Sequence, residues 1–149
     1  MIYLYLYHFL IYSLTSAGIQ LNPTFQNIGL PTLDLAELTT ASNQRRVAFS
    51  PLPSNLFHLT NIFDFDNSLG ILSNPLTLTC TVNSNSLGQY NGITFSPDCS
   101  KLYGAVRYGM QIIDQFDLCA GSIQSIQNSK VSLNCSNYFL GTIQLATNG

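Results

Sequence analysis

The segment Asp64–Gly70 carries acidic and amide side chains in an order that begins a calcium loop. Its Asp-x-Asp-x-Ser pattern matches half of an EF-hand, which binds calcium through oxygen ligands. The glycine that the loop requires is Leu69 here, and the bidentate glutamate position is Pro75. We therefore predict no metal site. The segment is instead typical of a turn that ends a strand, because Asp and Asn bond to nearby backbone and Gly accepts positive φ.

The two histidines, His8 and His58, offer little for catalysis. They lie far apart in the sequence, have no carboxylate partner nearby and lack the spacing of metal ligands. The chain also has no Gly-x-Ser-x-Gly motif, phosphate-binding loop or dinucleotide fingerprint. We therefore predict no catalytic residues, no cofactor and no enzyme activity. We expect His58, which sits in an apolar run, to be a strand or loop residue.

The four cysteines show no Cys-x-x-Cys spacing, which argues against a zinc ribbon or a redox motif. Four cysteines allow three disulfide pairings, and the sequence does not choose among these and buried free thiols. Leu78-Thr79-Cys80 and Leu133-Asn134-Cys135 share a local pattern, which predicts equivalent strand positions in successive repeats. The other two cysteines are Cys99 and Cys119.

Three aromatic residues, Tyr103, Tyr108 and Phe116, could line a sugar- or peptide-binding surface. Aromatic side chains more often fill the space between packed sheets, and we expect that role here. Ligand-binding residues are therefore left unassigned. Charged residues make up only 8% of the chain, with a net charge of −2. Nucleic acid is excluded as a partner because no basic face can be built from five cations, Arg45, Arg46, Lys101, Arg107 and Lys130.

Residues 1–17 begin with an apolar, aromatic segment, Met1–Leu14. The segment is too short to predict a membrane span, and its length is that of the apolar region of a signal peptide. Thr15-Ser16-Ala17 would serve as a cleavage site, although no basic residue precedes the segment. The alternation of Tyr3, Tyr5 and Tyr7 equally suits a strand of an earlier repeat, and an artefactual start is a third interpretation.

The elements that would position these residues are short strands centred on Tyr90–Leu118. Ile93–Phe95 alternates apolar and polar residues and is followed by a Ser-Pro-Asp turn. Two further strands follow, at Leu102-Tyr103 and at Met110–Phe116. We expect residues 18–44 to be irregular or a remnant of a preceding repeat.

Parts of this stretch recur along the chain. Val47–Phe57 matches Ile93–Tyr103 at an offset of 46 residues, and Phe65-Asp66 matches Phe116-Asp117 at an offset of 51. A third copy begins with Ile143–Gly149. Periods of about 40 to 50 residues built from short strands are typical of β-propellers, whose blades cannot cover their own faces. At 149 residues the chain is too short for a full propeller.

The repeat resembles a known group of proteins. Phe95–Tyr103, FSPDCSKLY, resembles the FSPDG-K-LYV element of bacterial YVTN-type and WD-like propellers, and FDFDNSLGILSNPLTL resembles a segment of secreted or surface propellers of Bacteroidetes. The resemblance covers residues 45–149. Cys99 stands where the group has a turn glycine, which implies backbone strain or a different turn. The spacing also suggests that the first repeat has lost part of a hairpin.

We therefore predict an all-β fold, a partial β-propeller of about two to three four-stranded antiparallel blades, some incomplete, within residues 45–149. The resemblance implies a non-enzymatic module for interaction or structure, exported or at the cell surface and part of a larger protein. Its expected partners are protein or carbohydrate, with self-association as a way to cover blade edges. The alternatives are a piece of a lactonase-like propeller enzyme, for which side chains near Asn91–Phe95 would face the channel, and a non-functional truncated gene product.

Overall fold

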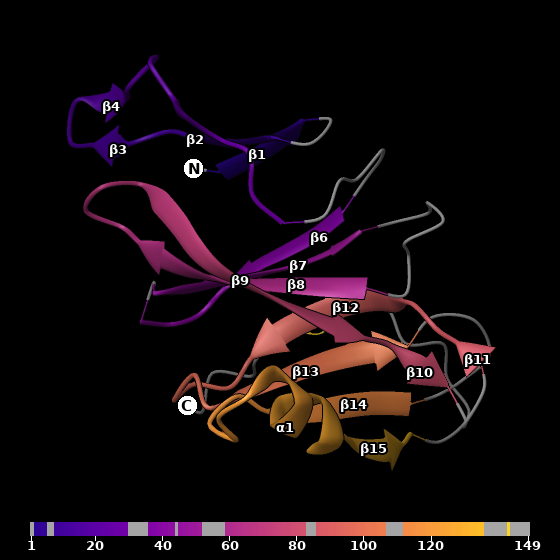
Figure 1. The fold of residues 1–149 in the computed structure, drawn as a ribbon. Helices are drawn as coiled ribbons and strands as arrows, with labels where there is room; N and C mark the ends of the chain where they lie inside the picture. The colour runs from indigo at the N-terminus through magenta and orange to yellow at the C-terminus, as the bar shows by residue number, and fades with distance from the viewer. Residues whose placement is uncertain are drawn as a thin grey trace.

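The computed structural model describes residues 2–5, 8–29, 36–43, 45–51, 59–82, 86–106, 112–135 and 143. Within these residues, three antiparallel sheets follow one another in chain order, and two short hairpins accompany them (Figure 1). The predicted all-β class is confirmed. One short helix, α1 (Ile123–Asn128), is inserted near the end of the described chain.

The first four-stranded sheet, here called the first blade, has its strands in sequence order. These are β6 (Ala36–Thr40), β7 (Arg46–Pro51), β8 (Leu59–Asp66) and β9 (Ile71–Thr79). The strand β6 lies inside the segment that we expected to be irregular or a remnant of a preceding repeat, and it pairs with β7 from Ala36 opposite Pro51 to Thr40 opposite Val47. The first blade therefore has four strands and has not lost a hairpin.

The second blade repeats this order. Its strands are β12 (Tyr90–Phe95), β13 (Lys101–Val106), β14 (Ile112–Asp117) and β15 (Val131–Asn134). The helix α1 joins the last two strands and buries Ile126. Its N-cap is Ser122, whose hydroxyl accepts a hydrogen bond from the Ser125 N–H at 3.1 Å.

A three-stranded N-terminal sheet precedes the first blade, in the order β1 (Ile2–Tyr5), β2 (His8–Ile11) and β5 (Thr24–Gln26). A small hairpin of β3 (Leu14–Thr15) and β4 (Gly18–Ile19) extends from it, and a second hairpin of β10 (Thr81–Val82) and β11 (Ser86–Leu87) links the two blades. The strand interpretation thus describes the start of the chain, and signal-peptide cleavage stays a prediction. No helix in the described residues is long and apolar enough to span a membrane.

Strand pairing corrects the repeat alignment. Arg46 lies opposite Asp64 between β7 and β8, and Lys101 lies opposite Asp117 between β13 and β14. The equivalent of β7 is therefore β13. Our match of Val47–Phe49 to Ile93–Phe95 was wrong, because it set a second strand against a first strand. Similar letters follow both strands, but the pairing partners show which residues share a place in the blade.

Asn74-Pro75, which we expected in a loop, lies within β9. The register between β8 and β9 shifts between Ile62 and Asp64. Asn74 and Pro75 therefore form a bulge in β9, with Asn74 at φ 49°. The side chain of Asn74 donates to Asp64 Oδ2 at 2.8 Å. A proline is tolerated here because a bulge removes residues from the hydrogen-bonded ladder.

Two apolar cores hold the three sheets together. Between the blades, Ile62 and Leu78 of the first pack with Phe95, Leu102 and other residues of the second. Between the N-terminal sheet and the first blade, a smaller core consists of Phe9, Ile11, Val47, Phe63 and Leu72. Each core is formed by facing sheet surfaces, as expected when a single sheet cannot bury both of its faces.

Candidate functional site

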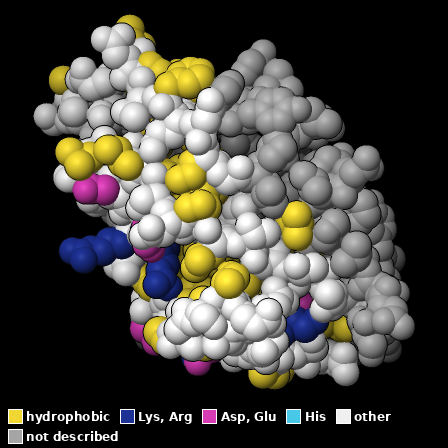
Figure 2. Space-filling view, viewed as in Figure 1, with side chains coloured by type: hydrophobic (Ala, Val, Ile, Leu, Met, Phe, Trp, Pro, Cys, Tyr) yellow, Lys and Arg dark blue, Asp and Glu magenta, His cyan; other side chains and the backbone are white. Residues whose placement is uncertain are grey.

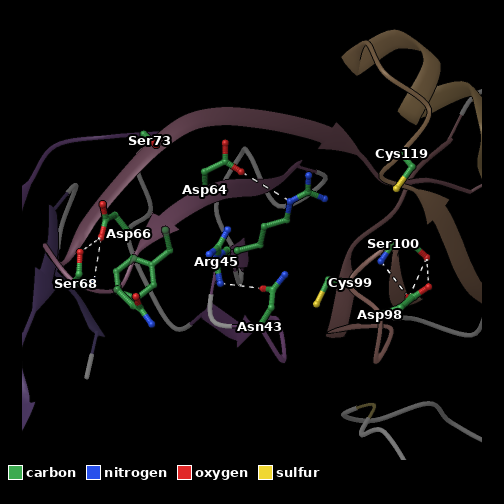
Figure 3. Close-up of a pocket in the computed structure, with 13 residues that line it drawn as sticks. Asn43, Arg45, Asp64, Asp66, Ser68, Ser73, Asp98, Cys99, Ser100 and Cys119 are labelled. Carbon is green, nitrogen blue, oxygen red and sulfur yellow. Dashed lines mark hydrogen bonds and ion pairs between the residues drawn. The ribbon is translucent and has the colours of Figure 1, made fainter.

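A polar cleft with a volume of about 720 Å³ opens where turns of both blades meet. Figure 3 shows side chains from several turns facing one another across it, and in Figure 2 charged side chains gather on the side of the molecule where these turns lie. The lining residues are Asn43, Arg45, Arg46, Asp64, Phe65, Asp66, Asn67, Ser68, Ser73, Asp98, Cys99, Ser100 and Cys119.

The turn between β8 and β9 forms one wall. Asp66 Oδ1 accepts hydrogen bonds from the Ser68 N–H at 2.9 Å, the Ser68 hydroxyl at 2.6 Å and the Leu69 N–H at 3.1 Å. Gly70 closes the turn at φ 65°. The bond from the Ser68 side chain is the main cause that lowers the pKa of Asp66. The predicted strand-ending turn is confirmed.

The turn between β12 and β13 forms the opposite wall. Asp98 Oδ1 accepts from the Ser96 hydroxyl at 2.5 Å and from the Ser100 N–H at 3.1 Å. These bonds, the one from Ser96 first, lower the pKa of Asp98 to about 2. Cys99 follows at φ 61°, so the backbone strain that we expected at this position is present.

The turn between β6 and β7 ties the two blades together. Ser42 Oγ donates to the Pro97 carbonyl at 2.6 Å and lies 3.3 Å from Cys99 Sγ. Burial raises the pKa of Cys99, but hydrogen bonds from the Ser42 side chain and from the Asn43 and Ser42 backbone outweigh burial and hold that pKa below its ordinary value. The Cys99 thiol is thus engaged by the neighbouring blade.

Two arginines also line the cleft, and their side chains differ in their contacts. Arg46 Nε lies 3.8 Å from Asp64 Oδ1, and both side chains are partly exposed. Arg45 is exposed, and its backbone N–H donates to Asn43 Oδ1 at 2.9 Å. Asp64, Asp66 and Asp98 each accept a hydrogen bond from the chain itself, and the exposed Arg45 guanidinium acts on the charge of Asp66 across the cleft. Guanidinium groups suit carboxylate and carbonyl oxygens.

A second polar cluster is centred on two buried side chains of the second blade, Tyr90 and Asp114, and the sequence analysis missed it. Tyr90 Oη donates to Asp114 Oδ2 at 2.7 Å, and Ser132 Oγ donates to Asp114 Oδ1 at 2.5 Å. Lys130 Nζ lies 3.6 Å from Asp114 Oδ2. Tyr90 passes over Gly104, where an added Cβ would lie 2.5 Å from the ring. The hydrogen bonds and the ion pair of the cluster pair its polar groups with one another, which is typical of a cluster that stabilises the fold.

The aromatic residues and histidines considered in the sequence analysis lie at different places in the structure. Phe116 is fully buried against Tyr90, which confirms its expected core role, and Tyr103 is half-buried. His58 and Tyr108 lie outside the described residues. His8 contributes its backbone to β2. No group of three or more His, Cys, Asp or Glu in the described part of the chain could hold a metal ion.

The four cysteines are free thiols in the structure. Cys80 directly follows β9 and Cys135 directly follows β15, the last strands of the two blades. The predicted equivalence of these two positions is confirmed. Cys80 and Cys99 are buried, whereas Cys119 is exposed at the cleft.

No protein-family model matches the chain, and no curated protein matches it significantly. It is similar to the β-propeller domain of Cps50 (Swd1) from Myceliophteria thermophila, with a TM-score of 0.54 at 12% identity. That match covers 81% of this chain and 36% of the domain, so the chain spans about a third of its length. A protein of unknown function from Desulfotomaculum acetoxidans gives a TM-score of 0.49 at 15% identity over 87% of this chain and 39% of that protein.

The match to the Swd1 domain concerns the fold alone. Two four-stranded sheets, packed face to face in chain order, have the arrangement of successive blades. The predicted fold is therefore confirmed, whereas the resemblance to YVTN-type propellers and to those of Bacteroidetes stays a prediction. This chain has the fold of part of a β-propeller.

Proposed function

We propose that this chain is a binding module without catalytic activity, part of a larger β-propeller, and that it holds a protein partner in the polar cleft. The observation that carries the proposal is that turns from two blades jointly build the cleft. Binding residues of many folds lie in such turns, because a rigid sheet positions loops that are free to vary.

The chemistry of the cleft favours binding over catalysis. A general acid needs a carboxyl group with a raised pKa, but hydrogen bonds within the turns lower the pKa values of Asp66 and Asp98. Both groups stay ionised at neutral pH and hold their own turns in place. They support the shape of the cleft and do not move protons.

The partner that suits the cleft is an extended peptide segment that presents a carbonyl or carboxylate oxygen to Arg45, since the three aspartates of the lining outnumber its two arginines and disfavour a strongly acidic partner. Arg45 offers an exposed guanidinium, and Ser73 and Asn67 add polar contacts around it. Phe65 is the one aromatic residue among the described residues that line the cleft. Sugar sites commonly stack their ligands on aromatic rings, so we favour protein over carbohydrate.

We further propose that the protein is exported or displayed at the cell surface. This proposal is supported by the apolar start of the sequence, the scarcity of charge and the resemblance to secreted propellers. Cell fractionation of the source organism with an antibody against the chain would test it, and recovery only in the cytoplasm would contradict it.

The test of the binding proposal is selection of peptides from a displayed library of random 12-residue sequences on the immobilised chain. We expect enrichment of peptides that bind the wild type. Binding should fall at least tenfold for Arg45→Ala and remain for Gln124→Ala, a polar side chain of α1 that is absent from the cleft lining. No enrichment, or enrichment that Arg45→Ala leaves unchanged, would contradict the proposal.

A separate assay addresses the enzyme alternative. The wild-type chain is incubated with glucono-δ-lactone, and acid release is followed at constant pH. We expect the spontaneous rate of hydrolysis. A higher rate that scales with protein concentration would show lactonase activity and overturn the non-catalytic interpretation.

A further inference from the structure

Ion pairing sets one acidic side chain of this protein apart from the others. Three carboxylates that the structure describes have a cation at an N–O distance of 3.0–3.8 Å, in the pairs Arg46–Asp64, Lys101–Asp117 and Lys130–Asp114. The positive charge of Arg45 acts on a fourth, Asp66. Asp98 forms no ion pair with a described residue, and hydrogen bonds, that of the Ser96 side chain first, lower its pKa. Asp98 is thus the carboxylate whose charge no described cation balances.

The Asp98 side chain is exposed and lines the polar cleft. Its hydrogen bonds come from its own turn. Oδ1 accepts from the Ser96 hydroxyl and the Ser100 N–H, and Oδ2 accepts from the Ser100 hydroxyl at 2.9 Å. These bonds, the one from Ser96 first, lower the pKa of Asp98 to about 2, so the group is ionised at neutral pH. Because each carboxylate oxygen has two acceptor sites, Oδ2 keeps a site for a further donor.

The charges of the cleft are unevenly divided between the two blades. Three aspartates and two arginines give the lining a net charge of −1. On the side of the first blade, Arg45 and Arg46 balance Asp64 and Asp66. The second blade adds Asp98 together with one serine and two cysteines, Ser100, Cys99 and Cys119. Figure 3 shows Asp98 on the opposite side of the cleft from Asp66, with Arg45 between them. The unbalanced negative charge therefore lies on one side of the cleft, at the second blade.

Given the proposed function of the cleft, on which this inference rests, we propose that the bound peptide segment carries a lysine or arginine whose cationic group lies against Asp98. The cationic group donates to the open site on Asp98 Oδ2, whereas an acidic side chain in the same place is repelled. A carbonyl or carboxylate oxygen of the same segment faces Arg45. The two contacts differ in sign and fix the direction of the segment, so Asp98 determines specificity.

A metal ion is a poorer match for the charge of Asp98. Calcium and magnesium require several oxygen ligands that converge on one point. No group of three or more His, Cys, Asp or Glu side chains within the described residues could hold such an ion. A basic side chain needs a single carboxylate, and a peptide that also contacts Arg45 brings it to that place.

The test uses peptides selected from the displayed library of random 12-residue sequences on the immobilised full chain. We expect the selected pool to gain lysine and arginine relative to the starting library. In the tightest-binding peptide, replacement of one basic residue by glutamine should weaken binding to the wild type about tenfold, the effect of one hydrogen bond between charged groups. With Asp98→Asn the same replacement should change the affinity little, because the double-mutant cycle isolates the contact between the two side chains.

Controls separate this contact from folding and from overall charge. Asp98→Asn keeps the Oδ1 acceptor of the turn, and unchanged near-UV circular dichroism confirms its fold. Asp117→Asn makes the same change in net charge at a residue outside the cleft lining and should leave the affinity unchanged. The glutamine replacement is made in the peptide, so its effect on the wild-type chain is measured even where a variant does not fold.

The possible results distinguish the role of Asp98 from the binding function of the cleft. Selected peptides that lack basic residues, or that bind the wild type and Asp98→Asn equally, would overturn the role of Asp98. If the same peptides still lost binding to Arg45→Ala, the proposed function would stand. An equal loss for Asp117→Asn would show attraction by net charge alone and would also overturn the role of Asp98. A selection that enriches no peptide would overturn both.

Discussion

Asn43 and Asp98 occupy the same place in successive blades, 55 residues apart in the chain. Asn43 Oδ1 accepts a hydrogen bond from the N–H two residues on, at Arg45, and Asp98 Oδ1 accepts one from the N–H of Ser100. The hairpins around them close with the same backbone bond, Ala41 N–H to Arg46 O and Ser96 N–H to Lys101 O, both at 2.9 Å. The side-chain acceptor in the turn is thus a shared feature of the two blades.

Replacement of Asp98 by Asn should therefore cost less stability at neutral pH than Asp98→Ala, because Asn keeps the Oδ1 acceptor and loses the charge, whereas Ala loses both. Thermal melts at pH 7 check this order. The folded pKa of Asp98 is depressed from 3.8 to about 2, so its charge contributes stability above pH 3.8 that is lost as pH falls toward 2. The stability difference between wild type and Asp98→Asn should shrink over that interval, and a difference independent of pH would contradict this account.

At position 99, glycine should give a more stable fold than alanine, because the backbone there has a positive φ. A residue other than glycine at φ 61° costs about 1–2 kcal/mol relative to the right-handed region. Both Cys99→Gly and Cys99→Ala lose the contact with Ser42, so the comparison isolates the backbone. We expect Cys99→Gly to be more stable than Cys99→Ala by about 1 kcal/mol in urea unfolding. Equal stabilities would mean that the turn changes conformation in the alanine variant.

The thiols should react in an order that their surroundings set. Burial raises the pKa of Cys80 to about 12, so this thiol is neutral and inaccessible at pH 8. Cys119 is exposed. Iodoacetamide at pH 8, followed by mass spectrometry of peptides, should alkylate Cys119 first and Cys80 only after urea is added. Early modification of Cys80 would show that the core between the blades opens in the native state.

The sequence predicted what depends on local pattern. Alternating residues indicated the strands, the Asp66–Gly70 segment indicated its turn, and the replacement of glycine by Cys99 indicated positive φ. The strand Ala36–Thr40 was missed because its letters do not resemble those of Tyr90–Phe95, although the two strands hold equivalent places. Backbone pairing fixes that equivalence, and many sequences satisfy it.

The cleft and the buried cluster depend on contacts between distant residues. Ser42 meets Cys99 across a gap of 57 residues, and no local pattern in either turn announces the other. Asp114 lies within the predicted strand Met110–Phe116, but neither its neighbours nor those of Gly104 in the sequence indicate that both residues contact Tyr90. The shared Ser-Pro sequence at Ser50-Pro51 and Ser96-Pro97 was misleading. The first pair ends β7, the second strand of its blade, whereas the second pair follows β12, the first strand of its blade.

Gly104 is required by the ring of Tyr90. An alanine Cβ would lie 2.5 Å from Tyr90 Cδ1, and the ring cannot retreat without loss of its bond to Asp114. We expect Gly104→Ala to destabilise the fold by about 1–3 kcal/mol, the usual cost of overpacking a core. In a Tyr90→Leu background the same change should cost much less. Additive effects in this double-mutant cycle, measured by urea unfolding, would show that the ring is not the obstacle.

Asn61 and Asp114 occupy equivalent positions in β8 and β14, since Asn61 lies opposite Thr77 and Asp114 opposite Ser132. Each accepts a hydrogen bond from its hydroxyl partner, at 3.2 Å and 2.5 Å respectively. The second polar atoms of the two side chains differ in their contacts. Asp114 also accepts from Tyr90, whereas Asn61 Nδ2 is buried with no hydrogen-bond partner. The second blade has a satisfied polar cluster where the first has an unpaired donor.

Leucine should therefore have opposite consequences at these two positions. Asp114→Leu leaves the buried Tyr90 hydroxyl without its acceptor and removes the carboxylate beside Lys130, whose ammonium still donates to Thr81, so it should destabilise the fold by about 1–3 kcal/mol, the cost of an unsatisfied buried polar group. Asn61→Leu removes an unpaired buried donor and, combined with Thr77→Val, should be neutral or stabilising. Urea unfolding of both variants decides the matter. A large loss of stability for the Asn61→Leu, Thr77→Val double variant would mean that Asn61 Nδ2 has a hydrogen-bond partner in solution. A buried water molecule would then be the simplest such partner.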